Sequence, residues 1–93
     1  MTVAYAEIRL FAPWVHSLKE KRMELQSLMV RTRAKFNVSV AEADTRDKHQ
    51  ILTLAVAAVT GDSAGADRVL DHVLRFIQEN TEAEITDVFR EHR

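Results

Sequence analysis

The chain has 93 residues, no cysteine and a formal net charge of -1, and 46% of its residues are hydrophobic while 29% are charged. This length and composition are typical of one globular domain spanning residues 1–93, and they exclude a disordered or low-complexity protein. The absence of cysteine excludes disulfides, thiolate nucleophiles and cysteine-ligated zinc, and it agrees with a reducing compartment.

No stretch of the sequence is long and apolar enough to predict a signal peptide or a transmembrane helix. We therefore expect a cytoplasmic protein with no membrane partner.

The first predicted element is a strand. Residues Thr2 to Phe11 alternate strictly between two faces, which is the period of a half-buried strand. We expect its aliphatic face to pack against helices; that face consists of Ala4, Ala6, Ile8 and Leu10. Pro13 then marks a connection over residues Ala12 to His16, since proline has no place in a strand interior.

A helix is predicted to begin at Leu18, because Ser17 and Glu20 have the spacing of a capping box. Residues at helical spacing then predict a core-facing stripe of Leu18, Leu25, Leu28, Met29, Thr32 and Phe36. A narrower apolar strip points away from the core, at Met23, Val30 and Ala34. That strip is consistent with scattered surface residues or with a partner contact.

Two further strands follow this helix. Phe36 to Glu42 alternates and predicts the second strand, and Asp44 to Lys48 predicts a polar turn. Gln50 to Thr60 predicts a third strand that is apolar on both faces, which is typical of the middle of a sheet.

The C-terminal third predicts a helix and a last strand. Gly61 to Ser63 ends the third strand and caps a helix from Ala64 to Glu79, in which Asp71 and Arg75 are one turn apart and can pair. Asn80 and Thr81 end this helix. Residues Ala83 to Glu91 predict a strand with imperfect alternation.

The order strand, helix, strand, strand, helix, strand predicts an α+β fold. Right-handed crossovers give a ferredoxin-like βαββαβ sandwich, in which a four-stranded antiparallel sheet carries two helices on one face. The first and third strands are expected to be central. The other sheet face would be uncovered in a monomer, and it carries Tyr5, Phe11, Ile51, Ala55, Ala57 and Val59. Such a face usually binds a partner, most often a second copy, so we expect a homodimer.

The basic residues gather on the first helix. Its first turn and the next residue hold Lys19, Lys21 and Arg22, although helix starts favour acidic side chains. These cations and the free N–H groups after Ser17 could bind phosphate, and Trp14 could stack on a base or cover one end of the core. Three more cations extend the positive charge along the helix: Arg31, Arg33 and Lys35. The alternative is a solvated helix surface.

The sequence offers no recognisable catalytic, metal or cofactor site. A metallochaperone site lacks its cysteines, and the residues after the first strand lack the glycines of a phosphate cradle. The histidines are dispersed, and the predicted open sheet face lacks an aromatic on the third strand for base stacking. We therefore expect a non-enzymatic protein without metal or cofactor.

Two motifs carry a resemblance to a known family. Ser17-Leu18-Lys19-Glu20-Lys21-Arg22 and Phe36-Asn37-Val38-Ser39-Val40-Ala41-Glu42 resemble the YlxP-like family of small bacterial proteins of unknown function, and the resemblance covers nearly the whole chain. It implies a ferredoxin-like fold, a bacterial cytoplasmic setting and genes near those for translation initiation and ribosome maturation. Where the family tends to have a Trp after the turn between the second and third strands, this chain has His49.

Two functional hypotheses follow. In the first, the basic helix binds RNA or a ribosomal particle through the phosphate backbone. In the second, the protein is a homodimeric interaction module that uses the open sheet face and has no nucleic-acid role. The two hypotheses are compatible with each other.

Overall fold

A computed structural model describes residues 1–43 and 49–93 of the chain. The elements follow the order β1 (Thr2–Phe11), α1 (Leu18–Lys35), β2 (Ser39–Glu42), β3 (Ile51–Thr60), α2 (Ser63–Asn80) and β4 (Glu84–His92). The polar turn predicted for Asp44 to Lys48 lies outside the described residues.

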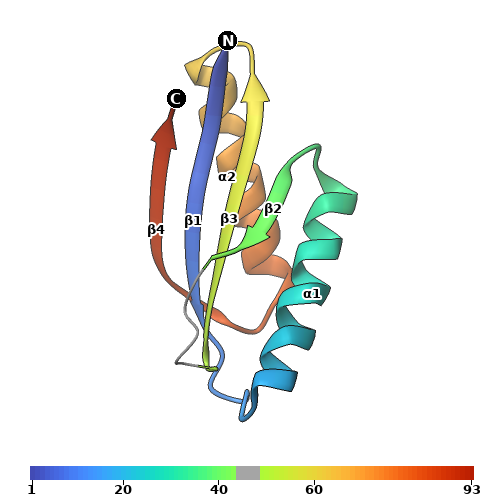
Figure 1. The fold of residues 1–93 in the computed structure, drawn as a ribbon. Coiled ribbons are helices and arrows are strands. Elements are labelled where there is room, and N and C mark those ends of the chain that lie inside the picture. The colour runs from blue at the N-terminus through green and yellow to red at the C-terminus, as the bar shows by residue number, and fades with distance from the viewer. Residues whose placement is uncertain (44–48) are drawn as a thin grey trace.

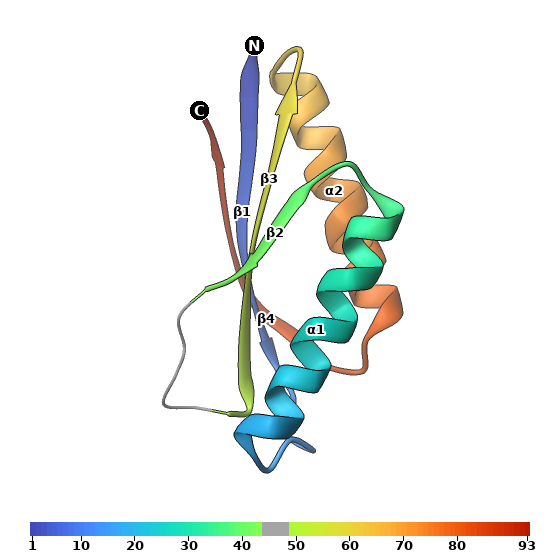
Figure 2. The same ribbon diagram turned by 45° about the vertical axis from the view of Figure 1, so that its right-hand side comes forward.

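The four strands form one antiparallel sheet in the order β2-β3-β1-β4. Both helices cover the same face of this sheet and leave the other face without a helix (Figures 1 and 2). This arrangement confirms the predicted ferredoxin-like sandwich with β1 and β3 in the centre.

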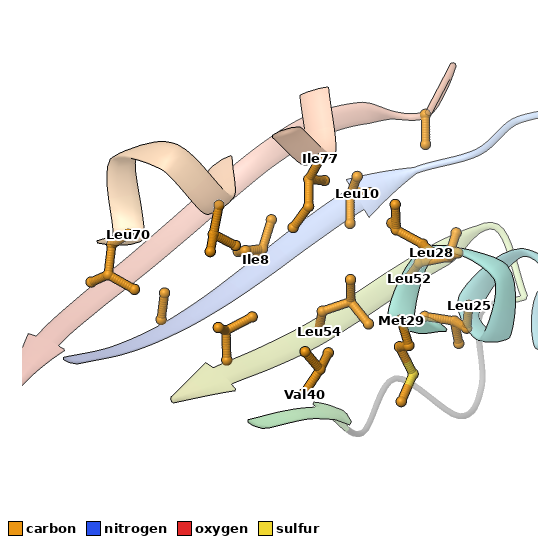
Figure 3. Packing of buried hydrophobic residues seen from close by; sticks show 14 of the residues in the cluster. Ile8, Leu10, Leu25, Leu28, Met29, Val40, Leu52, Leu54, Leu70 and Ile77 are labelled. Atoms are coloured by element: carbon orange, nitrogen blue, oxygen red, sulfur yellow. The ribbon is translucent and has the colours of Figure 1, made fainter. Parts of the chain in front are cut away.

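The core lies between the sheet and the two helices. The predicted aliphatic face of β1 is buried, and residues from β3 and both helices complete the packing (Figure 3). Large side chains that are almost entirely inaccessible include Ile8, Leu10, Leu25, Leu52, Leu54, Leu70 and Ile77. A single apolar layer of this kind supplies most of the favourable free energy of folding in a small domain.

The predicted cap of α1 is present. Ser17 has an extended backbone, and its hydroxyl oxygen accepts a hydrogen bond from the Glu20 N–H at 3.1 Å. The helix ends at Lys35, and the C-cap is Phe36, which has an extended backbone and donates its N–H to the Thr32 carbonyl. The predicted start of the second strand at Phe36 is therefore wrong, since β2 begins at Ser39.

Two residues of α1 differ from the prediction in their exposure to solvent. Leu18 was predicted in the core but is 56% exposed, because the first turn of α1 lies at the end of the molecule beside the β1–α1 loop (Figure 2). Lys21 was predicted at the surface but is 4% exposed. It precedes Leu25 and Leu28 by four and seven residues, so it lies on the core-facing side of the helix.

A β-bulge explains the imperfect alternation of β4. Arg9 pairs with Asp87 and Leu10 pairs with Ile85, so Thr86 is an extra residue on the β4 side. Ile85 and Val88 consequently both pack against the core although they are three residues apart. Phe89 pairs with Glu7 and therefore lies on the opposite face.

Candidate interaction surface

The sheet face that no helix covers is a candidate interaction surface, and we call it the open face. On β1 and β3 it carries Val3, Tyr5, Glu7, Arg9, Phe11, Ile51, Thr53, Ala55, Ala57 and Val59, and on β4 it carries Asp87, Phe89 and Glu91. Figure 2 shows the sheet nearly edge-on, with both helices on its other side. Strand alternation thus places all six residues of the predicted dimer face on one surface.

The open face is apolar toward the N-terminal end of β1. Val59 is 67% exposed, whereas Ala55 and Ala57 beside it on β3 are half-buried. A pocket of about 310 Å³ opens next to these residues and is lined by Val3, Asn37, Val38, Ser39, Ala57, Ala58 and Val59. Exposed apolar residues around a hollow are typical of protein interfaces.

Phe89 adds an aromatic ring to this face and was not predicted there. Its side chain is 52% exposed. Alternation counted along β4 from Ile85 would place it with the core residues, and only the bulge at Thr86 reverses that assignment. The sequence signal for this bulge was the spacing of three between the apolar residues Ile85 and Val88.

The centre of the open face is polar. Glu7 and Arg9 alternate on β1, Thr53 lies opposite Arg9 on β3, and Asp87 lies opposite Arg9 on β4. The Tyr5 hydroxyl donates a hydrogen bond to Glu7 Oε2 at 2.9 Å. Because this bond and the negative charge of Glu7 both favour the neutral phenol, they raise the pKa of Tyr5 above its ordinary value. Glu7 is thus held in place by a neighbour on its own strand.

Arg93 borders this polar centre. Its guanidinium lies 4.7 Å from the centroid of the Tyr5 ring and forms an ion pair with Glu91. Stacking of arginine on an aromatic face is favourable and orients both groups. Tyr5 is therefore fixed by Arg93 at its ring and by Glu7 at its hydroxyl.

The predicted anion site on α1 is divided by the helix geometry. Lys19, Arg22 and Arg33 are exposed and share one flank, because Arg33 follows Arg22 by eleven residues, a helical repeat. Arg31 and Lys35 are exposed on the other flank. The cations that were predicted to converge after Ser17 are thus only Lys19 and Arg22, since Lys21 points into the molecule.

Contacts of the α1 side chains limit this site further. Arg33 donates a hydrogen bond from Nη2 to the carbonyl of Val40 at 3.1 Å, which ties α1 to β2. Arg31 donates from Nε to the Ser27 carbonyl one turn earlier. Among the cations of the described surface, Lys19 and Arg22 are the two that stand together at the helix start.

Trp14 lies beside the flank of α1 that carries Arg31 and not beside Lys19 and Arg22. It is half-buried against the core, and its indole N–H donates to Glu24 Oε1 at 3.4 Å. It lines an open groove of about 430 Å³ together with Glu24, Arg31, Glu79, Asn80, Thr81 and Glu82. Three carboxylates and one guanidinium line this groove, and the net negative charge does not favour binding of a nucleic-acid phosphate beside Trp14.

Within residues 1–43 and 49–93 there is no group of three or more His, Asp or Glu side chains placed to hold a metal ion. No helix in the same part of the chain is long and apolar enough to cross a membrane.

Ion pairs connect the edge strand β4 to α2. Arg90 donates from Nη1 to Asp71 Oδ1 at 2.6 Å and also contacts Asp67, and His92 Nε2 lies 3.0 Å from Asp67 Oδ1. The hydrogen bond from Arg90 is the main cause that lowers the pKa of Asp71 below its ordinary value, and Arg75 contributes less. The principal partner of Asp71 is therefore Arg90 and not the predicted Arg75.

This ion pair predicts a measurable titration. Because the pKa of Asp71 is lower in the folded than in the unfolded state, the pair stabilises the fold above the unfolded pKa and loses that effect as the pH falls through the folded pKa. Replacing Arg90 by Ala should raise the pKa of Asp71 toward its ordinary value, because the variant lacks the main cause of the shift. Nuclear magnetic resonance titration of the Asp71 carboxyl carbon measures this pKa. In the control variant Arg75→Ala, the pKa of Asp71 should stay below its ordinary value. An unchanged pKa in Arg90→Ala would contradict the assignment.

The two sequence comparisons match proteins of unknown function. Residues 3–90 match the family described as "Protein of unknown function (DUF503)". The chain is 34% identical over 84 residues to the uncharacterized protein YlxP of Bacillus subtilis (strain 168), covering 90% of this chain and 91% of that protein.

Solved structures are similar in fold alone. The de novo designed protein Foldit4 matches with a TM-score of 0.53 and 17% identity, over 99% of this chain and 94% of that one. The crystal structure of PA3566 from Pseudomonas aeruginosa matches with a TM-score of 0.49 and 21% identity, over 99% of this chain and 90% of that one.

Proposed function

Because the chain belongs to the DUF503 family of proteins of unknown function, we propose a function from its own surface: it is a non-enzymatic interaction module that forms a homodimer through the open face. The observation that carries this proposal is the exposure of Val59 and Phe89 on a sheet face that no helix covers. Burying these side chains together with Ala55 and Ala57 would remove apolar surface from water.

The open face is large enough for a specific but modest interface. Strands β1, β2, β3 and β4 have 10, 4, 10 and 9 residues; at a rise of about 3.3 Å per residue and a spacing of about 4.8 Å between strands, they cover about 500 Å² in each copy. Two such faces would bury about 1,000 Å² in total, which is close to the smallest area of a specific interface. We therefore expect a dissociation constant in the micromolar range.

A second copy is favoured over another partner by the charges on this face. A two-fold interface brings the same patch of both copies together, so it must be complementary to itself. The open face carries both signs of charge near its centre, at Glu7, Arg9 and Asp87, and a face of one sign would repel its own copy.

Sedimentation equilibrium tests the proposal on the unmodified chain. Between about 1 and about 200 µM protein, we expect the average mass to rise from that of the monomer to that of the dimer. A chain that stays monomeric over this range would contradict the proposed function.

A second candidate function is binding of RNA or a ribosomal particle through the phosphate backbone by α1. Lys19 and Arg22 favour it, because both are exposed and adjacent at the start of a helix whose first turn holds a single acidic residue, Glu20. Phosphate contacts of this kind are electrostatic and carry little sequence specificity.

Replacing Lys19 and Arg22 by Ala should weaken binding to single-stranded RNA and to ribosomal subunits. For single-stranded RNA, the slope of the logarithm of the binding constant against the logarithm of the salt concentration should become less steep by about 1.4. Fluorescence anisotropy and co-sedimentation at increasing salt measure these effects. The matched control replaces Arg31 and Lys35 by Ala, which removes the same charge from the other flank. Equal losses in both double variants, or no binding by the unmodified chain at low salt, would reject this candidate.

A further inference from the structure

The outer side of α1 carries apolar residues that the proposed homodimer does not use. Met23 is 64% exposed and Val30 is 56% exposed. Both lie on the side of α1 opposite its buried residues, and no other helix or strand lies over that side (Figures 1 and 2). Among the described residues, α2 has no exposed large apolar side chain, so the pattern is particular to α1.

The spacing of these residues is that of a coiled-coil contact. Ser27 follows Met23 by four residues, Val30 follows Ser27 by three, and Ala34 follows Val30 by four. Spacings that alternate between three and four residues keep one narrow line of side chains toward a second helix. We call this line the outer seam, and it extends about 17 Å along α1. Ser27 and Ala34 are small and exposed, so a second helix can approach closely between Met23 and Val30.

Cations predominate beside the outer seam. Lys19 and Arg33 flank it on one side and Arg31 flanks it on the other, and all three are exposed. In the heptad phase of the seam these are e and g positions, whose side chains meet the charged residues of a second helix. Glu24 also stands at such a position, but its carboxylate accepts a hydrogen bond from the Trp14 indole. A complementary helix is therefore acidic on both sides of its own apolar stripe.

Hydrogen bonds hold two of these cations in place. Arg33 Nη2 donates to the Val40 carbonyl at 3.1 Å, and Arg31 Nε donates to the Ser27 carbonyl at 3.4 Å. A guanidinium has five N–H donors, so one such bond does not prevent a contact with a carboxylate. Side chains that are already ordered lose less conformational freedom on binding.

The combination of seam and charge favours an acidic helix over other partners. A second copy of α1 in a two-fold contact would bring cations close to cations. The phosphate backbone of RNA binds cations by electrostatics and gains nothing from exposed apolar side chains. A membrane surface requires a broad apolar face with large residues, whereas the outer seam is one residue wide.

We propose that the outer side of α1 binds an acidic amphipathic helix of a partner protein. The apolar stripe of that helix packs on the outer seam, and its carboxylates pair with Lys19, Arg31 and Arg33. Because α1 and the open face are on opposite sides of the sheet, this inference goes beyond the proposed homodimer, and each copy of the dimer can bind one helix.

A synthetic peptide tests the inference on the full chain. The probe is a fluorescent peptide of about 21 residues, with Leu at the a and d positions and Glu at the e and g positions of each heptad. Fluorescence anisotropy should give a dissociation constant of about 10 to 100 µM. The matched peptide with Lys in place of every Glu should bind at least about tenfold more weakly, because its charges repel the flanking cations.

Substitutions in the outer seam separate apolar packing from electrostatics. The double variant Met23→Gln/Val30→Gln should raise the dissociation constant of the acidic peptide about tenfold or more, since Gln favours a helix but removes apolar surface. The matched control is Leu18→Gln, because Leu18 is 56% exposed on α1 but lies outside the seam. This control should bind the peptide like the unmodified chain, and circular dichroism checks the folding of both variants.

A charge reversal tests the role of the flanking cations. The double variant Lys19→Glu/Arg31→Glu should bind the Lys peptide more tightly than the acidic peptide, which reverses the preference of the unmodified chain. An unchanged preference would overturn the assigned pairing of charges.

Two further variants distinguish this inference from the proposed homodimer. Ala34 belongs to the outer seam, whereas Ala57 lies on the open face. Ala34→Glu should therefore weaken binding of the acidic peptide and leave the homodimer unchanged, and Ala57→Glu should do the reverse. A monomeric unmodified chain that binds the peptide would contradict the homodimer and support the acidic-helix site.

Three results would overturn the inference. The first is an acidic peptide that does not bind at about 1 mM. The second is peptide binding that Met23→Gln/Val30→Gln leaves unchanged, since the contact would then be electrostatic, as with RNA phosphates. The third is binding to phosphatidylserine vesicles, lost in the same double variant, by a chain that does not bind the peptide; the occupant would then be a membrane surface.

Discussion

Replacing Leu54 by Ala is expected to lower the free energy of unfolding by about 3 to 4 kcal/mol. Leu54 is completely buried on the central strand β3, where it pairs with Ile8 of β1. Figure 3 shows its side chain pointing into the same space as Val40 and Met29. The truncation removes apolar contacts from three elements at once and leaves a cavity that the sheet cannot close by moving one side chain.

Such a loss is a large part of the stability of a domain of this size, which is typically about 5 to 15 kcal/mol. Urea denaturation at a protein concentration that favours the monomer measures it. Leu18→Ala is the matched control, because the same atoms are removed from a side chain that is 56% exposed; we expect a change within about 0.5 kcal/mol. Equal losses of unfolding free energy in the two variants would contradict the burial of Leu54 in the core described above.

Replacing Ala57 by Glu is expected to raise the dissociation constant of the proposed dimer about a hundredfold or more. Ala57 is half-buried on the open face, between Tyr5 of β1 and Ser39 of β2. A two-fold interface would bury the new carboxylate twice and without a partner. In the monomer the side chain faces water, so the fold should tolerate it.

The control for this variant is Ala34→Glu, which introduces the same side chain on the exposed surface of α1, on the far side of the sheet. Sedimentation equilibrium should show a monomer for Ala57→Glu and unchanged dimerisation for Ala34→Glu. Dimerisation of Ala57→Glu with the affinity of the unmodified chain would mean that the open face is not the interface.

Local patterns were sufficient to predict the fold. The strict alternation of Thr2 to Phe11, the cap at Ser17 and the two-faced apolarity of residues 51–60 each depend on neighbours in the sequence, and the structure has all three. Their order then allowed few topologies, because crossovers are right-handed. Element ends were predicted to within three residues, the largest difference being at the start of β2.

The candidate site could be predicted only in part, because it depends on register between distant strands. The six residues of the predicted dimer face followed from alternation within each of two strands, β1 and β3. The contact of Arg9 with Thr53, and the placement of Phe89 beside Glu7, depend on how β3 and β4 align with β1. Lys21 illustrates another limit: charge predicts a surface position, whereas its helical phase placed it inside.

The position of β1 in the sheet has a consequence for how the chain folds. β1 pairs with β3 on one edge and with β4 on the other, and the second pairing joins Ala4 to His92. Contacts between residues so far apart in sequence form slowly, because a long loop must close before they add stability. During synthesis, β1 keeps a free edge until residues 84–92 have left the ribosome. Strand β4 is thus the strand that completes this sheet and protects the free edge of β1.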